Sequence, residues 1–337
     1  MNNLVKDFLK PIRINKAYKY YPLFAEWGET LQNAFEDKVN ILFDQTEIPL
    51  FLADLNVFKD ESEQLYIKIY TEDLFGLYRL NISDQFPSGY MYEHVEGSLI
   101  SIKTHSSTIS FEEKMVKDPV RIHYVDGSMS YNCYLIQINL IDNTFDVDGL
   151  NQINWTVDIT KESMGKAQTK NTVQFQTLSM IQDQFEIIIN DDGSGEIADL
   201  VALRQENNEI ILSLYHCKYS SSPEAGRRLA DMYEVCGQAQ RSIRWKHAGL
   251  KHLFKHINGR NNKWLSEGFS RFVKGELADL EKYRNMANTM PIKLEVTIVQ
   301  PGLSKSVITE EISKLLACTE SYIKKTTRAD LKVWCST

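Results

Sequence analysis

The stretch that decides the fold is residues 191–245, DDGSGEIADLVALRQENNEIILSLYHCKYSSSPEAGRRLADMYEVCGQAQRSIRW. Its pattern predicts a turn, a strand, a second strand ending in His216-Cys217-Lys218, and then a helix. Asp199 opens the first apolar run, and His216 and Lys218 close the second. Burying a charge is costly unless the charge is paired or binds a metal. We therefore expect these three residues to form a site.

A tight turn between the two strands brings the three side chains together. Asn207-Asn208 stands at the centre of the polar segment, and asparagine tolerates the positive φ values of a two-residue hairpin turn. A turn centred there places Asp199 directly opposite His216, on the same face of the hairpin. Period-two alternation adds Lys218 to that face. We expect Asp199 and His216 to lie within reach of one ion.

At these residues the chain resembles the restriction-endonuclease-like, or PD-(D/E)XK, nuclease superfamily. That family has an acidic residue at the start of one strand, acid-x-Lys on the next, and then a helix with polar and basic residues. Asp199 matches the first acid and Lys218 the lysine, whereas His216 stands where the family usually has Asp or Glu. The resemblance covers roughly residues 170–337. More narrowly, the segment is similar to nuclease regions attached to bacterial helicase-like proteins of phage defence.

The resemblance implies a metal-dependent endonuclease that hydrolyses DNA phosphodiester bonds in anti-phage defence or DNA restriction. It assigns catalysis to Asp199, His216 and Lys218. Mg²⁺ or Mn²⁺ would be held by Asp199, His216 and the backbone carbonyl of Cys217, with Glu196 as a candidate further ligand. Because one ligand is an imidazole, Mn²⁺ should serve better than Mg²⁺. Cleavage should also fall as pH drops through the imidazole range, near pH ~6.5.

Charge is distributed unevenly along the chain. Residues 1–160 hold 13 Lys and Arg against 24 Asp and Glu, whereas the remainder holds 25 against 21. Residues 216–256 alone hold eight basic and three acidic residues. A basic patch beside a candidate metal site favours a polyanionic partner, although a solvated helix face is the alternative. The residues that we expect to contact DNA are Gln238, Gln240, Arg241 and Arg244.

The rest of the chain predicts two domains. We expect a largely antiparallel β-rich accessory domain over 1–160 with a helix near 22–36, a flexible linker over 161–170, and a nuclease-like domain over 171–337. Helices should cover about 171–182, 226–255 and 308–325, and strands about 293–299 and 330–335, completing a mixed α/β sheet. In the superfamily the helix before the hairpin often carries an acid facing the site. Here only Gln174 and Gln176 are available.

Composition narrows the class of protein. At 337 residues, with 43% apolar and 25% charged residues, the chain is long enough for two ordinary globular cores. No apolar run reaches the length of a membrane span, and the N-terminus lacks the features of a signal peptide. The five scattered cysteines suit a reducing cytoplasm. We expect a cytoplasmic protein without a membrane partner.

Three functions compete at this point. The first is the metal-dependent nuclease, and the second is a nuclease-fold module that binds nucleic acid without cutting it. In the third, a small-molecule or structural protein, Asp199 and His216 form only a buried hydrogen bond. The sequence does not decide whether the substrate is DNA or RNA. It also does not decide whether the protein works with an ATPase or helicase subunit or forms a homo-oligomer.

Overall fold

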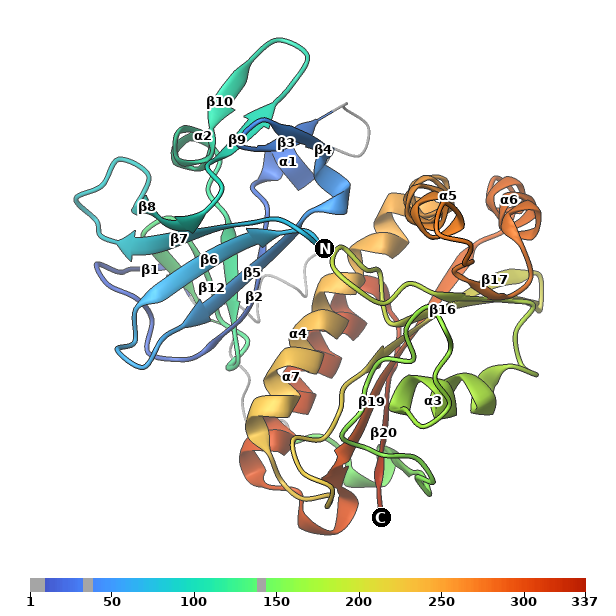
Figure 1. The fold of residues 1–337 in the computed structure, drawn as a ribbon. Coiled ribbons are helices and arrows are strands. Elements are labelled where there is room, and N and C mark those ends of the chain that lie inside the picture. The colour runs from blue at the N-terminus through green and yellow to red at the C-terminus, as the bar shows by residue number, and fades with distance from the viewer. Residues whose placement is uncertain (1–9, 33–38, 138–143) are drawn as a thin grey trace. The chain divides into compact units, whose positions relative to one another are not determined.

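The computed structural model describes residues 10–32, 39–137 and 144–337, and its chain forms two compact units (Figure 1). The units comprise residues 1–142 and 143–337, so the division falls earlier than the expected boundary at residue 160. Antiparallel sheets make up the first unit and a mixed sheet the second. The chain is therefore mixed α/β, as the sequence predicts at that level. None of the described helices is long and apolar enough to cross a membrane.

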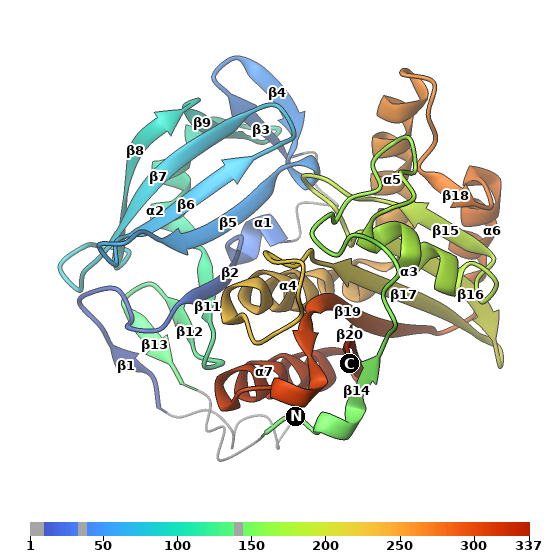
Figure 2. The ribbon, with the colours of Figure 1, turned by 60° about the horizontal axis from the view of Figure 1, so that its bottom comes forward.

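The first unit contains three antiparallel sheets around one apolar core (Figure 2). Their orders are β1-β13-β12-β11-β2, β10-β9-β3-β4 and β5-β6-β7-β8. The elements are β1 (Ile12–Arg13), β2 (Pro22–Glu26), α1 (Glu29–Gln32), β3 (Asn40–Phe43), β4 (Thr46–Pro49), β5 (Asp54–Lys59), β6 (Leu65–Tyr70), β7 (Phe75–Ile82), β8 (Tyr90–Gly97), β9 (Ile100–Lys103), β10 (Thr108–Ser110), α2 (Phe111–Lys117), β11 (Arg121–Tyr124), β12 (Met129–Tyr131) and β13 (Tyr134–Ile136).

The prediction of a helix near residues 22–36 is wrong for the residues of that range that the structure describes. Residues 22–26 form β2, and only the short α1 follows. Leu23, Phe24 and Ala25 are all buried, and Ala25 lies opposite Ile122 of β11. A run buried on both faces fits a strand better than a helix with one apolar stripe.

The second unit is built on one seven-stranded mixed sheet of order β14-β20-β19-β17-β16-β15-β18. The central pairs β15–β16 and β16–β17 are antiparallel, and β17, β19, β20 and β14 run parallel to one another. The strands are β14 (Leu150–Gln152), β15 (Ile187–Asn190), β16 (Leu200–Glu206), β17 (Glu209–Cys217), β18 (Phe272–Lys274), β19 (Ile292–Ser304) and β20 (Leu331–Ser336). The expected strands at 293–299 and 330–335 are thus confirmed.

The β16–β17 hairpin has the predicted turn and register. Asn207 and Asn208 have φ values of 47° and 61°, as a two-residue hairpin turn with left-handed centres requires. Glu206 lies opposite Glu209, and Leu200 lies opposite Tyr215. The next pair outward along this register would be Asp199 and His216, at the end of the hairpin.

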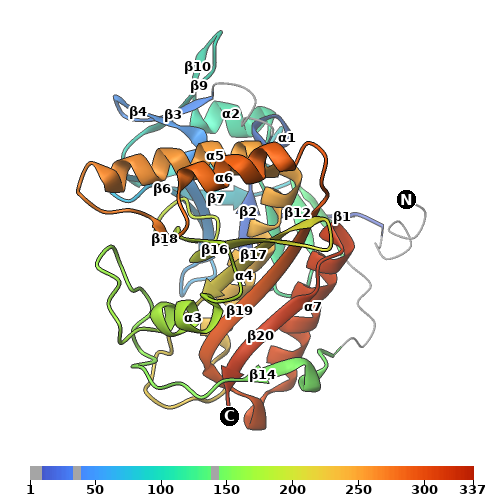
Figure 3. The same ribbon diagram turned by 90° about the vertical axis from the view of Figure 1, so that its right-hand side faces the viewer.

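Helices cover both faces of the sheet (Figure 3). On one face α3 packs against apolar side chains of β16 and β17, among them Leu200, Tyr215 and Cys217. On the other face α4 contacts β17, β19 and α7, and α7 contacts β20. The helices are α3 (Val173–Ile181), α4 (Leu229–Ser242), α5 (Arg244–Leu265), α6 (Leu277–Met286) and α7 (Glu310–Thr327).

The helix expected over 226–255 is in fact two helices. Ile243 separates α4 from α5, and Gly249 adds a non-helical kink with φ of 77°. A positive φ is easily adopted by glycine, so Gly249 is the point at which the chain can bend. Arg241 therefore lies at the end of one helix, and Arg244 begins the next.

The segment 161–170, expected to be a flexible linker, is instead a packed part of the second unit. Met164 is buried, and its backbone N–H donates to the side-chain oxygen of Gln174 on α3. Upstream of it, β14 pairs with β20. The segment from about residue 144 to residue 170 is therefore part of the same unit as the hairpin, and it brings Glu162 to the site described below.

Candidate functional site

The site lies where β16 begins and β17 ends, at one edge of the mixed sheet. Asp199 stands just before β16 and is buried. One of its carboxylate oxygens accepts the N–H of Cys217 at 2.8 Å, and the other accepts Nε2 of Gln174 at 2.7 Å. Gln174 is itself buried in the first turn of α3. Gln174 therefore fixes the Asp199 carboxylate, a larger role than the sequence indicated. Gln176 lies outside the site, where its side-chain oxygen accepts the N–H of Thr156.

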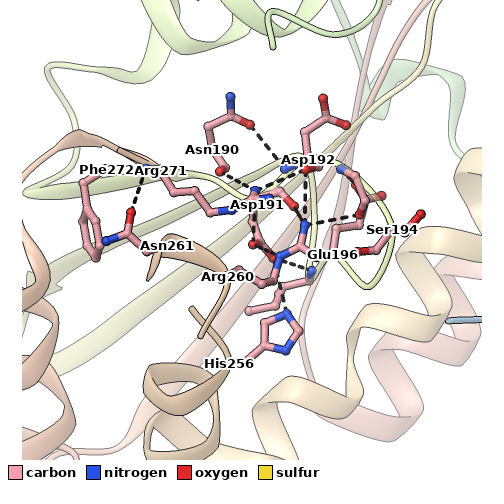
Figure 4. A network of polar contacts seen from close by, with 12 residues as sticks. Asn190, Asp191, Asp192, Ser194, Glu196, His256, Arg260, Asn261, Arg271 and Phe272 are labelled. Atoms are coloured by element: carbon pink, nitrogen blue, oxygen red, sulfur yellow. Dashed lines mark hydrogen bonds and ion pairs between the residues drawn. The ribbon is translucent and has the colours of Figure 1, made fainter. Parts of the chain in front are cut away.

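Two further carboxylates surround Asp199. Carboxylate oxygens of Asp192, Glu196 and Asp199 all lie within 4.8 Å of one another, and we call these three residues the acidic triad. Asp192 and Glu196 belong to the loop between β15 and β16, part of which is drawn in Figure 4. Burial, followed by repulsion from Glu196, Asp192 and Glu162, raises the pKa of Asp199 well above its usual value. The carboxylates gathered around Asp199 therefore disfavour its ionised form.

Lys218 lies between two other carboxylates. Its ammonium is 2.8 Å from Glu234 of α4 and 3.4 Å from Glu162, and Glu162 also accepts the N–H of Tyr219 at 2.9 Å. Burial alone would lower the pKa of Lys218, but Glu162 and Glu234 outweigh burial and raise it. Burial raises the pKa of Glu162, against the opposing charge of Lys218. Lys218 is thus a charged ammonium, and one of its partners, Glu162, also acts on Asp199 of the acidic triad.

His216 points to α4. Its Nε2 is 2.9 Å from Oγ of Ser242, and that hydroxyl donates its own proton to the carbonyl of Ala239. The Ser242 oxygen must therefore accept from Nε2–H, which leaves Nδ1 as a bare lone pair. Nδ1 is buried and has no hydrogen-bond partner.

The surroundings of His216 change two expectations. His216 is not one of the residues whose ligand atoms cluster in the described part of the chain, so the structure does not group it with Asp199 as a ligand pair. Burial, and then the charge of Arg241, lower the pKa of His216 to about 3. The imidazole stays neutral through the range near pH ~6.5, so its titration cannot produce the fall in activity that the sequence predicts there.

A small pocket beside His216 contains most of the residues expected to contact DNA. Gln238, Arg241 and Arg244 line it together with His216 and Glu196, and its other lining residues are Ile197, Ser242 and Trp245. Nε2 of Gln238 donates to Glu196 at 3.3 Å. The pocket is therefore joined to the acidic triad through Glu196.

Gln240 does not belong to this pocket. It is buried on α4, where its side-chain amide donates to Thr319 of α7 at 2.9 Å. Along α4, Gln238 and Gln240 are separated by about 200° of rotation, so they face different neighbours. The structure thus keeps Gln238, Arg241 and Arg244 as candidates for contact with DNA and assigns Gln240 to helix packing.

The donor atoms of the acidic triad suit a hard divalent cation. Mg²⁺ and Mn²⁺ prefer carboxylate oxygens, and the triad offers three carboxylates around one point. A cation there would also relieve the repulsion that raises the pKa of Asp199. Because this ligand set has no imidazole, the expected preference for Mn²⁺ over Mg²⁺ loses its basis. Glu196, a candidate further ligand in the sequence, is one of the three.

Asp192 and Glu162 are site residues that the sequence analysis missed. Asp192 stands in a glycine-bearing loop that indicated only a turn, and Glu162 stands in the segment expected to be a linker. A signal for Asp192 was nevertheless present, because Glu196 and Asp199 follow it at short spacing on one turn-forming segment. Nothing local marked Glu162, since tertiary packing alone brings it to Lys218.

Comparisons of the chain with protein-family models, with curated proteins and with solved structures found no match.

Proposed function

We propose that the protein is a divalent-metal-dependent nuclease that hydrolyses DNA phosphodiester bonds. The observation that carries the proposal is the acidic triad of Asp192, Glu196 and Asp199, whose carboxylate oxygens lie within 4.8 Å of one another, together with Lys218, which contacts Glu162 at the same end of the hairpin. Carboxylates grouped around one point, with a lysine next to them, are what metal-assisted phosphoryl transfer needs.

The order of elements supports membership of the PD-(D/E)XK superfamily. Asp199 immediately precedes one strand, Lys218 follows the end of the neighbouring antiparallel strand, and α4 with its polar and basic residues comes next. This order agrees with the superfamily pattern on which the resemblance rests. The anti-phage or restriction role rests on the resemblance alone, and the cytoplasmic setting rests on the five scattered cysteines.

The chemistry follows from the charges. Phosphodiester hydrolysis requires a water nucleophile in line with the leaving group and stabilisation of negative charge on the phosphoryl oxygens. A divalent cation held by the acidic triad would supply Lewis acidity at that point. Lys218, fixed by Glu162 and Glu234, would hold the attacking water and neutralise developing charge. Gln174 holds the Asp199 carboxylate in place for this task.

The residues that we propose to contact DNA line the pocket at one side of the site. Arg241 and Arg244 line the small pocket that shares Glu196 with the triad, so a phosphate group contacted by their guanidinium groups would lie near the cleavage centre. Guanidinium groups bind phosphate oxygens through paired N–H donors. The acidic triad, which would repel DNA by itself, is then flanked by cations on one side.

A nucleic-acid-binding module without cleavage is the second candidate. The observation that favours it is the position of His216, which bonds to Ser242 and leaves the acid-x-Lys pattern incomplete. In this candidate the basic residues of α4 and α5 bind DNA, and the triad holds at most a structural ion.

Cleavage of supercoiled plasmid tests the proposal. Wild-type protein should nick or linearise the plasmid with Mg²⁺ or Mn²⁺ and should be inhibited by EDTA. Asp192→Asn should lose this activity, and Asp183→Asn, an exposed acid in the same unit, should retain it. Retention of DNA without cleavage, across both metals and with RNA as a second substrate, would instead support the binding module.

A further inference from the structure

Asp191 and Asp192 are neighbours in sequence but have different surroundings. Asp191 is fully buried, and its carboxylate lies 2.6 Å from Nε of Arg260, 3.6 Å from Arg271 and 3.7 Å from Nε2 of His256 (Figure 4). Asp192 is only half-buried and belongs to the acidic triad. The charge of Asp191 is balanced within the protein, so this residue is not available to a cation from solution.

Arg260 also binds the backbone of the loop that follows Asp191. Its guanidinium donates to the carbonyl oxygens of Asp191 at 2.7 Å, Asp192 at 3.2 Å and Gly193 at 3.4 Å, and to that of Ser194. Five N–H donors in a planar fork make this multiple contact possible, and a lysine ammonium cannot reproduce it. One α5 side chain therefore fixes four successive carbonyl groups.

Two further contacts complete the hold on the loop. Arg271 donates to the carbonyl oxygens of Asn190 at 3.0 Å and Asp192 at 3.1 Å. The second carboxylate oxygen of Asp191 accepts the N–H of Ile197 at 2.8 Å, which closes the loop on itself. The fixed segment, residues 190–197, includes two of the three acidic residues of the triad.

We propose that Arg260, assisted by Arg271, is a positioning residue that holds Asp192 and Glu196 beside Asp199 before a cation binds. Like charges at this separation repel one another, so a loop without such anchors would relax and carry Asp192 and Glu196 away from Asp199. The anchors act on backbone carbonyls and leave the triad carboxylates to the cation. The inference rests on the proposed function for the identity of the ligand, a divalent metal.

The test compares Mn²⁺ binding, followed by electron paramagnetic resonance, in wild type, Arg260→Lys, Arg271→Lys and Thr319→Val. Arg260→Lys keeps a positive charge opposite Asp191 but loses the fork on the carbonyl groups. Thr319→Val removes a buried hydrogen bond to Gln240 away from the loop and so controls for general destabilisation. We expect Arg260→Lys to raise the Mn²⁺ concentration at half-saturation about tenfold or more, since groups that orient metal ligands have effects of ~10–100-fold. Arg271→Lys should act in the same direction, and Thr319→Val should match wild type.

Amide hydrogen exchange provides a second readout that needs no metal. In wild type without metal the N–H groups of Gly193 and Ile197, which are bonded to Glu196 and Asp191, should exchange slowly. In Arg260→Lys they should exchange faster, while amides of β16 stay protected. Half-saturation and exchange that match wild type in both arginine variants would overturn the inference while leaving the proposed function intact. A wild-type protein that binds no Mn²⁺ would instead overturn the proposed function together with the inference.

Discussion

Asp191 and Asp192 define two charged centres in one loop, and the two centres differ in how their charge is balanced. Burial alone would raise the pKa of Asp191, but Arg260, His256 and Arg271 outweigh burial and hold it well below its usual range. At the triad, burial and three neighbouring carboxylates all act in the same direction and raise the pKa of Asp199. The first centre is complete as the protein folds, whereas the second needs a proton or a cation.

The difference separates a structural charge from a functional one. Both centres contain buried or half-buried carboxylates within a few residues of each other, so burial alone does not distinguish them. What distinguishes them is the source of the opposite charge, which is an arginine from α5 for Asp191. For Asp199 the neighbouring charges that act most strongly are those of other carboxylates, Glu196, Asp192 and Glu162. We call the Asp191 centre the balanced centre and the acidic triad, where neighbouring carboxylates raise the pKa of Asp199, the unbalanced centre. We infer that the balanced centre stabilises the fold and that the unbalanced centre binds the ligand.

Breaking the balanced centre should have the largest effect on stability. Asp191→Asn leaves the buried Arg260 without its partner carboxylate, and removing one partner of a buried ion pair costs about 3–5 kcal/mol. Urea unfolding at pH 7 should show this loss, and Asp183→Asn should unfold as wild type does. A loss below about 1 kcal/mol would contradict the assignment of Asp191 as a structural charge.

Removing the ammonium of Lys218 should have the largest effect on activity. Lys218→Ala loses the cation that is proposed to hold the attacking water and should lower the rate of plasmid cleavage by roughly 10²–10³-fold. DNA retention in a filter or gel assay should change little. The exposed Lys161→Ala, in the same unit, is the matched control. Cleavage at the wild-type rate by Lys218→Ala would remove this residue from the mechanism.

Relieving the unbalanced centre should stabilise the protein without metal. Because the folded-state pKa of Asp199 is raised, its contribution to stability is complete below its unfolded value of ~3.9 and is lost as pH rises through the raised folded value. Asp192→Asn removes one of the repelling charges and should lessen that loss. In EDTA its melting temperature should exceed that of wild type at pH 8, and the difference should vanish toward pH 4.

Excess Mn²⁺ should reverse the order of melting temperatures of the two proteins at pH 8, because only wild type keeps all three charged carboxylates of the triad. If Asp192→Asn melts below wild type in EDTA at pH 8, the triad is not a centre of repulsion. The same comparison with Asp183→Asn should show no change under either condition.

The pocket residues should have the smallest measurable effect. Arg241→Ala and Arg244→Ala should each lower the slope of log affinity for DNA against log salt by about 0.9 in magnitude, since each lost phosphate contact releases about one fewer counterion. Arg284→Ala on α6, which pairs with Glu281, serves as a control with the slope of wild type. Unchanged slopes in both pocket variants would show that these arginines do not contact phosphate.

The hairpin and the helix before it, α3, were predictable from the sequence because their signals are local. Asn207-Asn208 fixed the turn, and alternation along β16 and β17 then set which residues meet. The separate roles of Asp191 and Asp192 were not predictable, because the residue that distinguishes them, Arg260, lies 69 positions from Asp191 along the chain. Likewise, the expected helix near 22–36 failed because a distant strand, β11, pairs with residues 22–26.

The prediction that Asp199 and His216 share one face within reach of one ion is not supported, because Asp199 bonds to Gln174 of α3 and His216 bonds to Ser242 of α4, and these helices cover opposite faces of the sheet. The register holds as far as Leu200 and Tyr215, but the His216 ring hydrogen-bonds to Ser242 of α4. Side-chain direction at the end of a strand depends on the helix packed over it, and that packing is a tertiary feature that a strand pattern does not contain.

The most direct test of the central claim is a Mn²⁺ titration at pH 7 of wild type and Asp192→Asn, followed by electron paramagnetic resonance. We expect wild type to bind Mn²⁺ at a saturable site that is lost or at least about tenfold weaker in Asp192→Asn. Asp183→Asn should bind as wild type does. Equal binding by wild type and Asp192→Asn, or no saturable binding by wild type, would contradict the claim that the acidic triad holds a divalent cation.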